Sequence, residues 1–371
     1  MKGVIKTSLT RIFLLTFVLS NVFAHRSLAL SCTLTGNSLD NLEYVKTNCK
    51  EIIVEDLLVP PGKTLDFTGI SDVSIVFKGK TSFEFKKWKG PLVLVSGNNV
   101  NITGAEGAVI DGNGTQWWNQ LGGSGSILRP RMFKLRYVNN VNVNNLYFLN
   151  SPRHCFAIHN CTNVTVTNVV IDDSAGDTYY RIHNTDGFDV KGSENVYIKD
   201  VQVFNQDDCL AVRSGKNIHF ARGYCYHGHG LSIGSVGNRT NNIVENVYIT
   251  DSKLVNADNG IRIKTVFNCT GSVTNIYYNN ITMSGIQKVG IVLQGDYRNT
   301  RPTGTPTDGV PIKNVTITNV RGTVSESGTN IYILLADGVA ENWYWENVTV
   351  TGGMKKRKCS GIPEGSHAFC D

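Results

Sequence analysis

Helical periodicity is almost missing from this chain after residue 50, and no CxxC pair occurs among its nine cysteines. A zinc site built from closely spaced thiolates is therefore not expected. After residue 24, no segment is apolar and long enough to span a membrane. Neither sign of charge dominates, with 36 basic and 30 acidic residues, and no basic stripe is dense enough to indicate nucleic-acid binding. The one basic run, at 354–358, fits a solvated loop.

The N-terminus has the composition of a secretory signal peptide. Three basic residues precede an uncharged apolar stretch at 12–24, which is too short to span a membrane comfortably. Val22 and Ala24 are small enough for the −3 and −1 positions of a cleavage site, and Ser27 and Ala29 offer a second one. We expect removal of residues 1–24, or cleavage as late as residue 29, and a secreted, extracellular domain at 30–371; a membrane anchor is less favoured. Loss of residues 1–24 removes three basic and no acidic residues, so the net charge falls from +6 to +3.

An exported chain with nine cysteines is expected to form disulfides. Cys155, Cys161 and Cys269 have no obvious partner, and the odd total leaves at least one thiol unpaired. Nine N-x-S/T sequons also occur, and we expect some of them to be glycosylated, although most fall inside a repeat. Three further pairs are near enough in sequence to close short loops: Cys32 with Cys49, Cys209 with Cys225, and Cys359 with Cys370.

A short strand pattern, Asn-Val/Ile-x-apolar, recurs along the chain. Its copies start at 99, 140, 163, 195, 217, 246, 275, 314 and 347, so successive starts differ by 22 to 41 residues. Each copy alternates apolar and polar residues, as a half-buried strand does. A recurring strand with irregular insertions is typical of a solenoid.

Strands that alternate with turns, without crossover helices, predict an all-β, single-stranded right-handed parallel β-helix rather than a doubly wound fold. Its coils stack at ~4.8 Å with Val and Ile inward, and the recurring asparagines bond along one column of turns. Residues 38–50 have the periodicity and the N-terminal serine of a short helix, which would cap the open first coil. An antiparallel sandwich or barrel is less favoured, because tight Asn-Gly hairpins are missing between most copies.

Three carboxylates and a histidine recur at the length of one coil. The stretch HNTDGFDV at 183–190 holds Asp186, and FNQDDCLAV at 204–212 holds Asp207 and Asp208. Both Asp186 to Asp207 and Asp208 to His229 span 21 residues, close to the shortest interval of the repeat. The four side chains should therefore lie on one face of neighbouring coils. Carboxylates this close do not all ionise easily, so one pKa is expected to rise, and the group concerned is expected to keep its proton as an acid.

The next coil should bring two cations to the same wall. In GIRIKT at 260–265, alternation places Arg262 and Lys264 opposite Ile261 and Ile263, hence outward if the isoleucines point inward. Each feature alone has an explanation without function, since an Asp-Asp turn is usually solvated and exposed ion pairs contribute little to stability. Their joint occurrence at coil spacing favours a functional site.

Four segments resemble the signatures of the polygalacturonases, glycoside hydrolase family 28, in the family's order and at its intervals. They are NTDGFDV, NQDDCLAV, GHGLSIGS at 228–235 and RIKT, and further similarity covers essentially the whole mature chain. It runs through IDGNGTQWW at 110–118, RPRMFKL at 129–135 and GIVLQGDY at 290–297. The resemblance implies a right-handed β-helix that hydrolyses α-1,4 bonds between galacturonates in pectin, with inversion and without a metal or cofactor.

The resemblance also implies residue roles. Asp207 would be the general acid that protonates the leaving oxygen, Asp186 and Asp208 would activate the attacking water, and His229 would support the acid's protonation. Inversion rests on the resemblance, because coil spacing does not exclude a retaining geometry. Galacturonate is an anion, which accounts for cations in a hydrolase cleft. The implied substrate-binding residues are Asn184, Gly230, Arg262, Lys264 and Tyr297.

Three positions depart from the family's pattern. His227 stands where the first of two glycines is usual, Arg213 replaces an asparagine, and Gly295 stands where a polar side chain is common. If Arg213 faces the cleft, it would lower the pKa of Asp207 or bind another galacturonate. Asp189 and His227 fit structural roles, and Asp189 is left out of the predicted site as a residue that holds a turn.

The expected partner is an acidic polysaccharide, homogalacturonan, with polygalacturonase-inhibiting proteins as further partners and a monomeric state. Endo action is favoured, because no long insertion walls off one end of the groove. An exo-acting relative and a rhamnogalacturonan hydrolase are the alternatives within hydrolases. A calcium-dependent pectate lyase would need a metal and an arginine base. A catalytically silent pectin- or inhibitor-binding homologue is disfavoured, because no signature carboxylate is lost.

Overall fold

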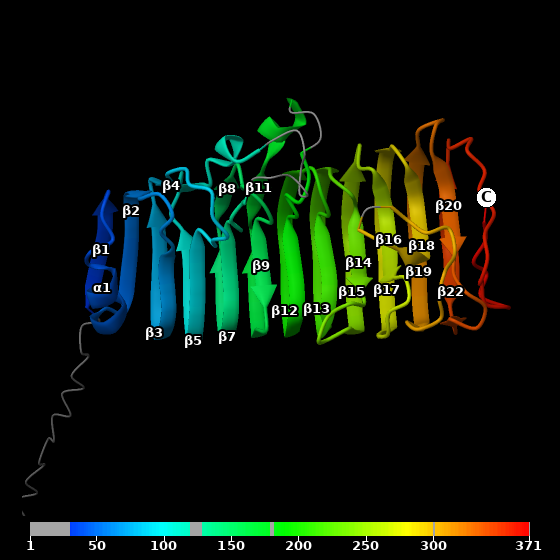
Figure 1. The fold of residues 1–371 in the computed structure, drawn as a ribbon, viewed down its shortest axis with the longest axis horizontal. Coiled ribbons are helices and arrows are strands. Elements are labelled where there is room, and N and C mark those ends of the chain that lie inside the picture. Colours follow the sequence, from blue (N-terminus) through cyan, green and yellow to red (C-terminus); the bar gives the residue numbers. More distant parts are fainter. Residues whose placement is uncertain (1–29, 119–127, 179–181, 300, 371) are drawn as a thin grey trace, which may run out of the picture.

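The computed structural model describes residues 30–118, 128–178, 182–299 and 301–370, so the predicted signal peptide at 1–24 lies outside the described residues. Within the described ranges, no helix is long and apolar enough to cross a membrane. The chain winds as a parallel β-helix, with coils that succeed one another along the long axis of the molecule (Figure 1). Strand pairs run parallel, as in β12 with β13 and β14 with β16, so the antiparallel sandwich is wrong.

The elements follow the chain as one series of strands with few helical turns. The helical elements are α1 (Leu42–Asn48), η1 (Gly114–Gln116) and η3 (Ser174–Thr178). The first strands are β1 (Ser31–Gly36), β2 (Glu51–Val59), β3 (Leu65–Lys78), β4 (Lys80–Phe83), β5 (Val93–Gly104), β6 (Val109–Asp111), β7 (Phe133–Asn144), β8 (Tyr147–Leu149), β9 (Phe156–His159), β10 (Thr162–Thr167) and β11 (Val170–Asp172). The later strands are β12 (Phe188–Asn205), β13 (Leu210–His227), β14 (Leu231–Val236), β15 (Ile243–Val255), β16 (Asn259–Val266), β17 (Ser272–Ile286), β18 (Val289–Tyr297), β19 (Ile312–Val324), β20 (Thr329–Leu334), β21 (Ala340–Glu341) and β22 (Tyr344–Thr351).

One wall of the helix carries the predicted site. It contains β9, the first residues of β12 and β13, and the strands β14, β16, β18 and β20. Apolar side chains of successive coils align behind this wall, and Leu210, Leu231 and Ile261 stand in register at full burial. The core is therefore one continuous apolar column, which fixes the vertical alignment of the residues that face outward.

The predicted column of asparagines exists. Each side-chain Nδ2 donates to Oδ1 of the asparagine one coil earlier, from Asn140 on Asn99 through to Asn342 on Asn314, at 2.7–3.0 Å. The members have φ of 51–59°, the left-handed region that asparagine tolerates better than most residues. The last predicted copy is assigned to the wrong column, because Asn347 bonds to Asn319 and Asn342 continues the first column.

The first coil is covered as expected. The helix α1 buries Leu42 and Val45 and lies beside β1 at the start of the solenoid (Figure 1). It begins after Asn41 rather than at Ser38, whose hydroxyl instead accepts a hydrogen bond from the amide of Asp40. All three proposed short-loop disulfides form, and Cys155, Cys161 and Cys269 are free thiols.

Candidate active site

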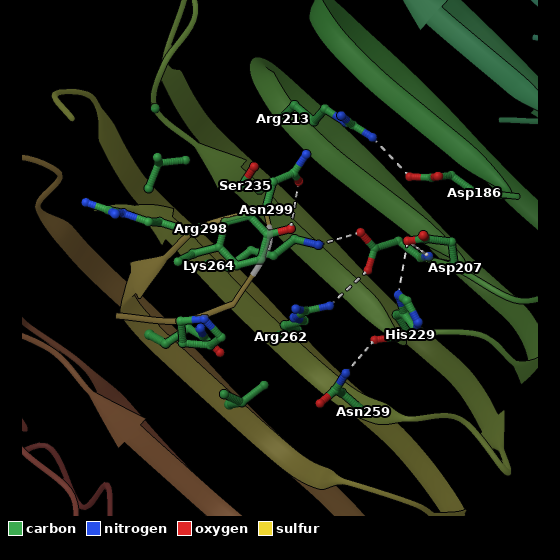
Figure 2. A pocket seen from close by; sticks show the side chains of 18 of the residues that line it. Asp186, Asp207, Arg213, His229, Ser235, Asn259, Arg262, Lys264, Arg298 and Asn299 are labelled. Carbon is green, nitrogen blue, oxygen red and sulfur yellow. Dashed lines mark hydrogen bonds and ion pairs between the residues drawn. The ribbon is translucent and has the colours of Figure 1, made fainter. Parts of the chain in front are cut away.

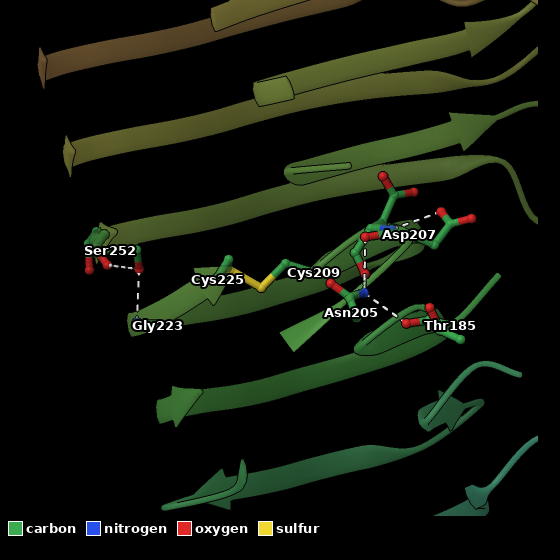
Figure 3. The surroundings of a disulfide bond; sticks show 9 residues. Thr185, Asn205, Asp207, Cys209, Gly223, Cys225 and Ser252 are labelled. Carbon is green, nitrogen blue, oxygen red and sulfur yellow. Dashed lines mark hydrogen bonds between the residues drawn. A yellow bond between two sulfur atoms is a disulfide. The ribbon is translucent and has the colours of Figure 1, made fainter. Parts of the chain in front are cut away.

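A tight turn at residues 205–209 joins β12 to β13 and presents Asp207 and Asp208. The buried Asn205 amide holds this turn, since its Nδ2 donates to the carbonyl oxygens of Thr185, Asp207 and Asp208 at 2.8–3.1 Å. The disulfide between Cys209 and Cys225 closes the same region (Figure 3). The two carboxylates are therefore carried by rigid backbone rather than by a loose loop.

The three predicted carboxylates lie together at this corner, and neighbouring coils are bonded there through their main chains. The amide of Gly187 donates to the carbonyl of Asp208 at 2.9 Å, and the amide of His229 donates to the carbonyl of Asp207 at 2.7 Å. Asp186 and Asp208 are 1–2 % exposed and Asp207 is 8 % exposed. The prediction that coil-length spacing superposes these side chains is confirmed.

Asp207 accepts several hydrogen bonds. His229 Nδ1 lies 3.1 Å from its Oδ1, which also accepts from the amide of Asp208 at 2.8 Å. Its Oδ2 accepts from the amide of Asn184 at 2.8 Å and from the Asn184 side chain at 3.3 Å. Asn184, one of the predicted substrate-binding residues, thus also fixes the carboxylate in place.

Asp208 is tied to the two predicted cations. Lys264 Nζ lies 2.6 Å from Oδ2, Ser232 Oγ donates to Oδ1 at 2.6 Å, and Arg262 Nη1 lies 3.6 Å from Oδ1. Tyr297 packs over both cations, with Arg262 Cζ and Lys264 Nζ 5.9 and 5.5 Å from its ring centroid. Figure 2 shows Arg262 and Lys264 gathered with Asp186, Asp207, Arg213 and His229 around one space.

That space is a cleft of about 950 Å³. Most of the predicted site residues line it, from Asn184 and the three carboxylates to Tyr297. Gly230 does not line it. A Cβ on Gly230, whose φ is +99°, would meet the carbonyl oxygens of Asn259 and Gly260 at 2.4 Å, so this glycine permits close stacking of coils.

The comparisons with known proteins agree with this geometry. The sequence model of the glycosyl hydrolases family 28 matches residues 49–370. The chain belongs to glycosyl hydrolase family 28. It is 49% identical over 341 residues to endopolygalacturonase 1 of Colletotrichum lindemuthianum and 46% identical over 341 residues to a polygalacturonase of Saccharomyces cerevisiae, covering 92% of this chain and 93% of each relative. The structure of endopolygalacturonase I from Stereum purpureum, complexed with two galacturonates, matches with a TM-score of 0.79 at 30% identity, over 86% of this chain and 95% of that one.

Protonation within this family 28 site differs from carboxylate to carboxylate. Burial raises the pKa of Asp186 well above its usual range, and the nearby Asp207 charge raises it further. Burial would also raise the pKa of Asp207, but the charge and hydrogen bond of His229, with the cation of Lys264, hold it well below its usual range. Burial would lower the pKa of His229, but Asp207 raises it. The expectation that the acid carries the raised pKa is therefore wrong: the rise falls on Asp186, whereas Asp207 is ionised and pairs with protonated His229.

One expectation about a neighbouring residue is wrong. Asp189 does not hold a turn: it is a buried residue of β12, 2.6 Å from Arg213 Nε and 2.8 Å from His154 Nδ1. Arg213 does face the cleft, but its direct partners are Asp186 and Asp189 rather than Asp207. His227 is structural, as expected, with Nδ1 2.9 Å from Asp177.

Sequence reasoning missed several groups of this family 28 cleft. Asp258 lies 3.4 Å from His229 Nε2 and 2.6 Å from Lys288 Nζ. Asn259 Nδ2 donates to the carbonyl of His229 at 3.2 Å. Both belong to DNGIRIKT, the segment that carries Arg262, so their place one coil after His229 was the available signal.

Proposed function

We propose that this chain is an endo-acting polygalacturonase, which hydrolyses α-1,4-galacturonosyl bonds inside the homogalacturonan chains of pectin with inversion. The observation that carries the proposal is the cluster of three buried carboxylates, from two coils, bordered by cations in one cleft. The relatives named endopolygalacturonase, of which one is 49% identical, support the same activity.

Asp207 acts as the general acid in this proposal. Its proton is held in the resting site by the Asp207–His229 pair, in which His229 Nδ1 lies 3.1 Å from Oδ1. When the leaving glycosidic oxygen gains negative charge beside Asp207, the shared proton moves from the imidazolium through the carboxyl to that oxygen. His229 thus supplies the acid with its proton although the pKa of Asp207 itself is low in the free site.

Asp186 and Asp208 act as the base that activates water. Asp186 lines the cleft, and its buried Oδ1 accepts no hydrogen bond from the described residues, with His154 Nε2 3.4 Å away. Asp208 is held by Lys264 and Ser232, so its orientation is fixed. Inverting hydrolases place acid and base carboxyls on opposite sides of the sugar with room for one water.

Cations on both sides of the carboxylates support endo action. Arg153 lines the cleft from the coil that precedes Asp186, whereas Arg298 and Arg357 line it from coils beyond Lys264. A polyanion that crosses the carboxylates would find positive charge for galacturonate groups before and after the scissile bond. Arg262 and Lys264 take the carboxylates next to that bond, and Tyr297 contacts the sugar there.

Secretion is part of this proposal, with residues 1–24 as signal peptide, residues 30–371 as the β-helix domain, and a monomer as the working unit. Its substrate lies in cell walls, and the short-loop disulfides favour an oxidising compartment. Inhibitor proteins directed at polygalacturonases are proposed as further partners.

Release of reducing ends from polygalacturonic acid tests the activity. We expect oligomers early in the digestion, and Asp207→Asn should lower the rate by more than about 100-fold, because the acid is lost while shape is kept. Monomers or dimers from the start would indicate an exo enzyme. Binding without cleavage by both proteins would indicate a silent binding homologue.

A chelator separates hydrolysis from metal-dependent elimination. Asp207, Asp208 and His229 offer ligand atoms within 4.8 Å of one another, a spacing that could accept an ion, but Lys264 already neutralises Asp208. We predict an unchanged rate in excess EDTA and saturated products. A rate abolished by EDTA, with unsaturated products that absorb ultraviolet light, would support a lyase instead.

A further inference from the structure

A closed ring of ionic side chains surrounds Asp186 below the cleft. Arg213 Nη2 lies 3.0 Å from Asp186 Oδ2, and Arg213 Nε lies 2.6 Å from Asp189 Oδ1. His154 Nδ1 lies 2.8 Å from Asp189 Oδ2, and its Nε2 lies 3.4 Å from Asp186 Oδ1. Asp186, Asp189 and His154 are 1–2 % exposed, and 22% of the Arg213 side chain is exposed. Each oxygen of Asp186 therefore faces a residue that Asp189 holds in turn.

Arg213 lies at a β-bulge. In the pairing of β12 with β13, Val190 opposes Val212 but Lys191 opposes Ser214, so Arg213 is the extra residue. Val212 is fully buried, so alternation gives Arg213 the outward face, where it lines the cleft. Figure 2 shows the contact between Arg213 and Asp186.

The surroundings of His154 and Asp189 determine the charge that each of them carries. Burial lowers the pKa of His154 to about 4, so the ring carries no second cation from that histidine near neutral pH. Burial would raise the pKa of Asp189, but Arg213 and the hydrogen bonds from His154 and His159 hold it well below its usual range. Arg213 is thus a cation shared between one firmly ionised aspartate and Asp186.

We infer that Arg213 is a positioning residue that orients Asp186 and favours the ionised form that a base needs, against burial and the neighbouring carboxylates, with Asp189 and His154 fixing Arg213 from behind. The inference rests on the proposed hydrolase function. Without the guanidinium, Asp186 would be a buried carboxyl beside two other carboxylates and would hold its proton to higher pH. Other charged groups face Asp186 from neighbouring elements: Asp207, Asp208, Arg129, Arg153 and His154.

The pH dependence of kcat/KM for Arg213→Gln tests this role. We expect the acidic limb, which reports ionisation of the base, to move upward by about one pH unit or more, because an opposite charge lowers a carboxyl pKa by that amount. On the acidic side kcat should fall about tenfold or more with KM changed less than about threefold. Arg213→Lys should restore part of the shift, because lysine keeps the positive charge.

The matched control is Arg222→Gln on the same strand. Arg222 pairs with Asp200 at 2.6 and 2.8 Å, but this pair is exposed and lies outside the cleft, so the profile should not move. If the acidic limb of Arg213→Gln does not move, the inference is overturned. A raised KM with kcat unchanged would also overturn it, because that result would mark Arg213 as a substrate-binding residue. A wild-type chain inactive on polygalacturonate would overturn the proposed function instead. Thermal melting of each variant separates loss of fold from a shifted profile.

Discussion

Aspartates of similar burial in this molecule differ in protonation because their immediate neighbours differ. Asp207 has His229 and the amide of Asn184, whereas Asp186 has one cation and two nearby carboxylates. Spacing of 21 residues predicts the cluster, but the protonation of each member depends on hydrogen bonds that spacing does not contain. The sequence therefore predicted that one pKa would rise, but the rise falls on Asp186 and not on Asp207, the predicted acid.

Asp173 shows the same physics outside the cleft. It is fully buried, and burial raises its pKa from 3.8 to about 8, although Ser151 donates to both its oxygens. A folded-state pKa above the unfolded value means that the carboxyl costs stability as pH rises from about 4 to about 8. We predict that Asp173→Asn gains stability relative to wild type through that window, by about 1–3 kcal/mol at pH 8.

Denaturant unfolding of both proteins at pH 4.5, 6 and 8 measures the difference. The gain should be smallest at pH 4.5, where Asp173 is protonated in the folded chain. A difference between variant and wild type that is constant with pH would contradict a buried, neutral Asp173.

At the level of elements, left-handed corners within the strands organise the solenoid. The asparagine column gives each coil one side-chain hydrogen bond to the coil before it, and the left-handed φ of its members sets the corner. This column was predictable, because the asparagine and the two apolar positions after it recur together. Its last member was not, since Trp343 and Trp345 follow Asn342 where Val or Ile is usual.

Substitution within the column separates its two contributions. Asn246 has φ 55°, donates to Asn217 at 3.0 Å and accepts from Asn275 at 2.8 Å, and it is not part of a sequon. Both Asn246→Ala and Asn246→Gly lose these bonds, at about 1 kcal/mol each, but only alanine also strains the left-handed backbone. We predict that alanine destabilises more than glycine by about 1 kcal/mol.

The free energy of unfolding of both variants in urea measures this. Equal values would show that the hydrogen bonds, and not the backbone conformation, account for the asparagines.

The corner that carries the site was also predictable, whereas the residues that hold Asp186 in place were not. Asp186, Asp207 and His229 follow from coil length, and Arg262 and Lys264 from strand alternation. Alternation places Arg213 outward, since Val212 points inward, but neither rule predicts that Arg213 pairs with Asp186 and Asp189. The places of Asp189 and His154 could not be predicted, because no sequence pattern marks a buried aspartate unless its partners are known.

For the molecule as a whole, the cleft is an electropositive groove on a chain whose net charge, +6, is only mildly positive. Arg153, Arg262, Arg298, Arg301 and Arg357 line it on both sides of the carboxylates. Salt screens such charges over a Debye length that falls from about 14 Å at 0.05 M to about 4 Å at 0.5 M. We predict that KM for polygalacturonate rises several-fold over this range while kcat changes less than about twofold.

Initial rates at several substrate concentrations in each salt measure the effect. Highly methyl-esterified pectin, whose sugars carry few charges, is the matched control and should show a weaker salt dependence. A KM for polygalacturonate that does not respond to salt would contradict the proposed part of the cations.

The most direct test of the whole account is the anomeric form of the first products. Proton NMR during early digestion of polygalacturonate resolves the new reducing end before mutarotation. Three carboxylates from stacked coils, acting as acid and base on opposite sides of one bond, predict saturated oligomers that appear first as the β-anomer. First products in the α-anomeric form, or with an unsaturated end, would contradict it.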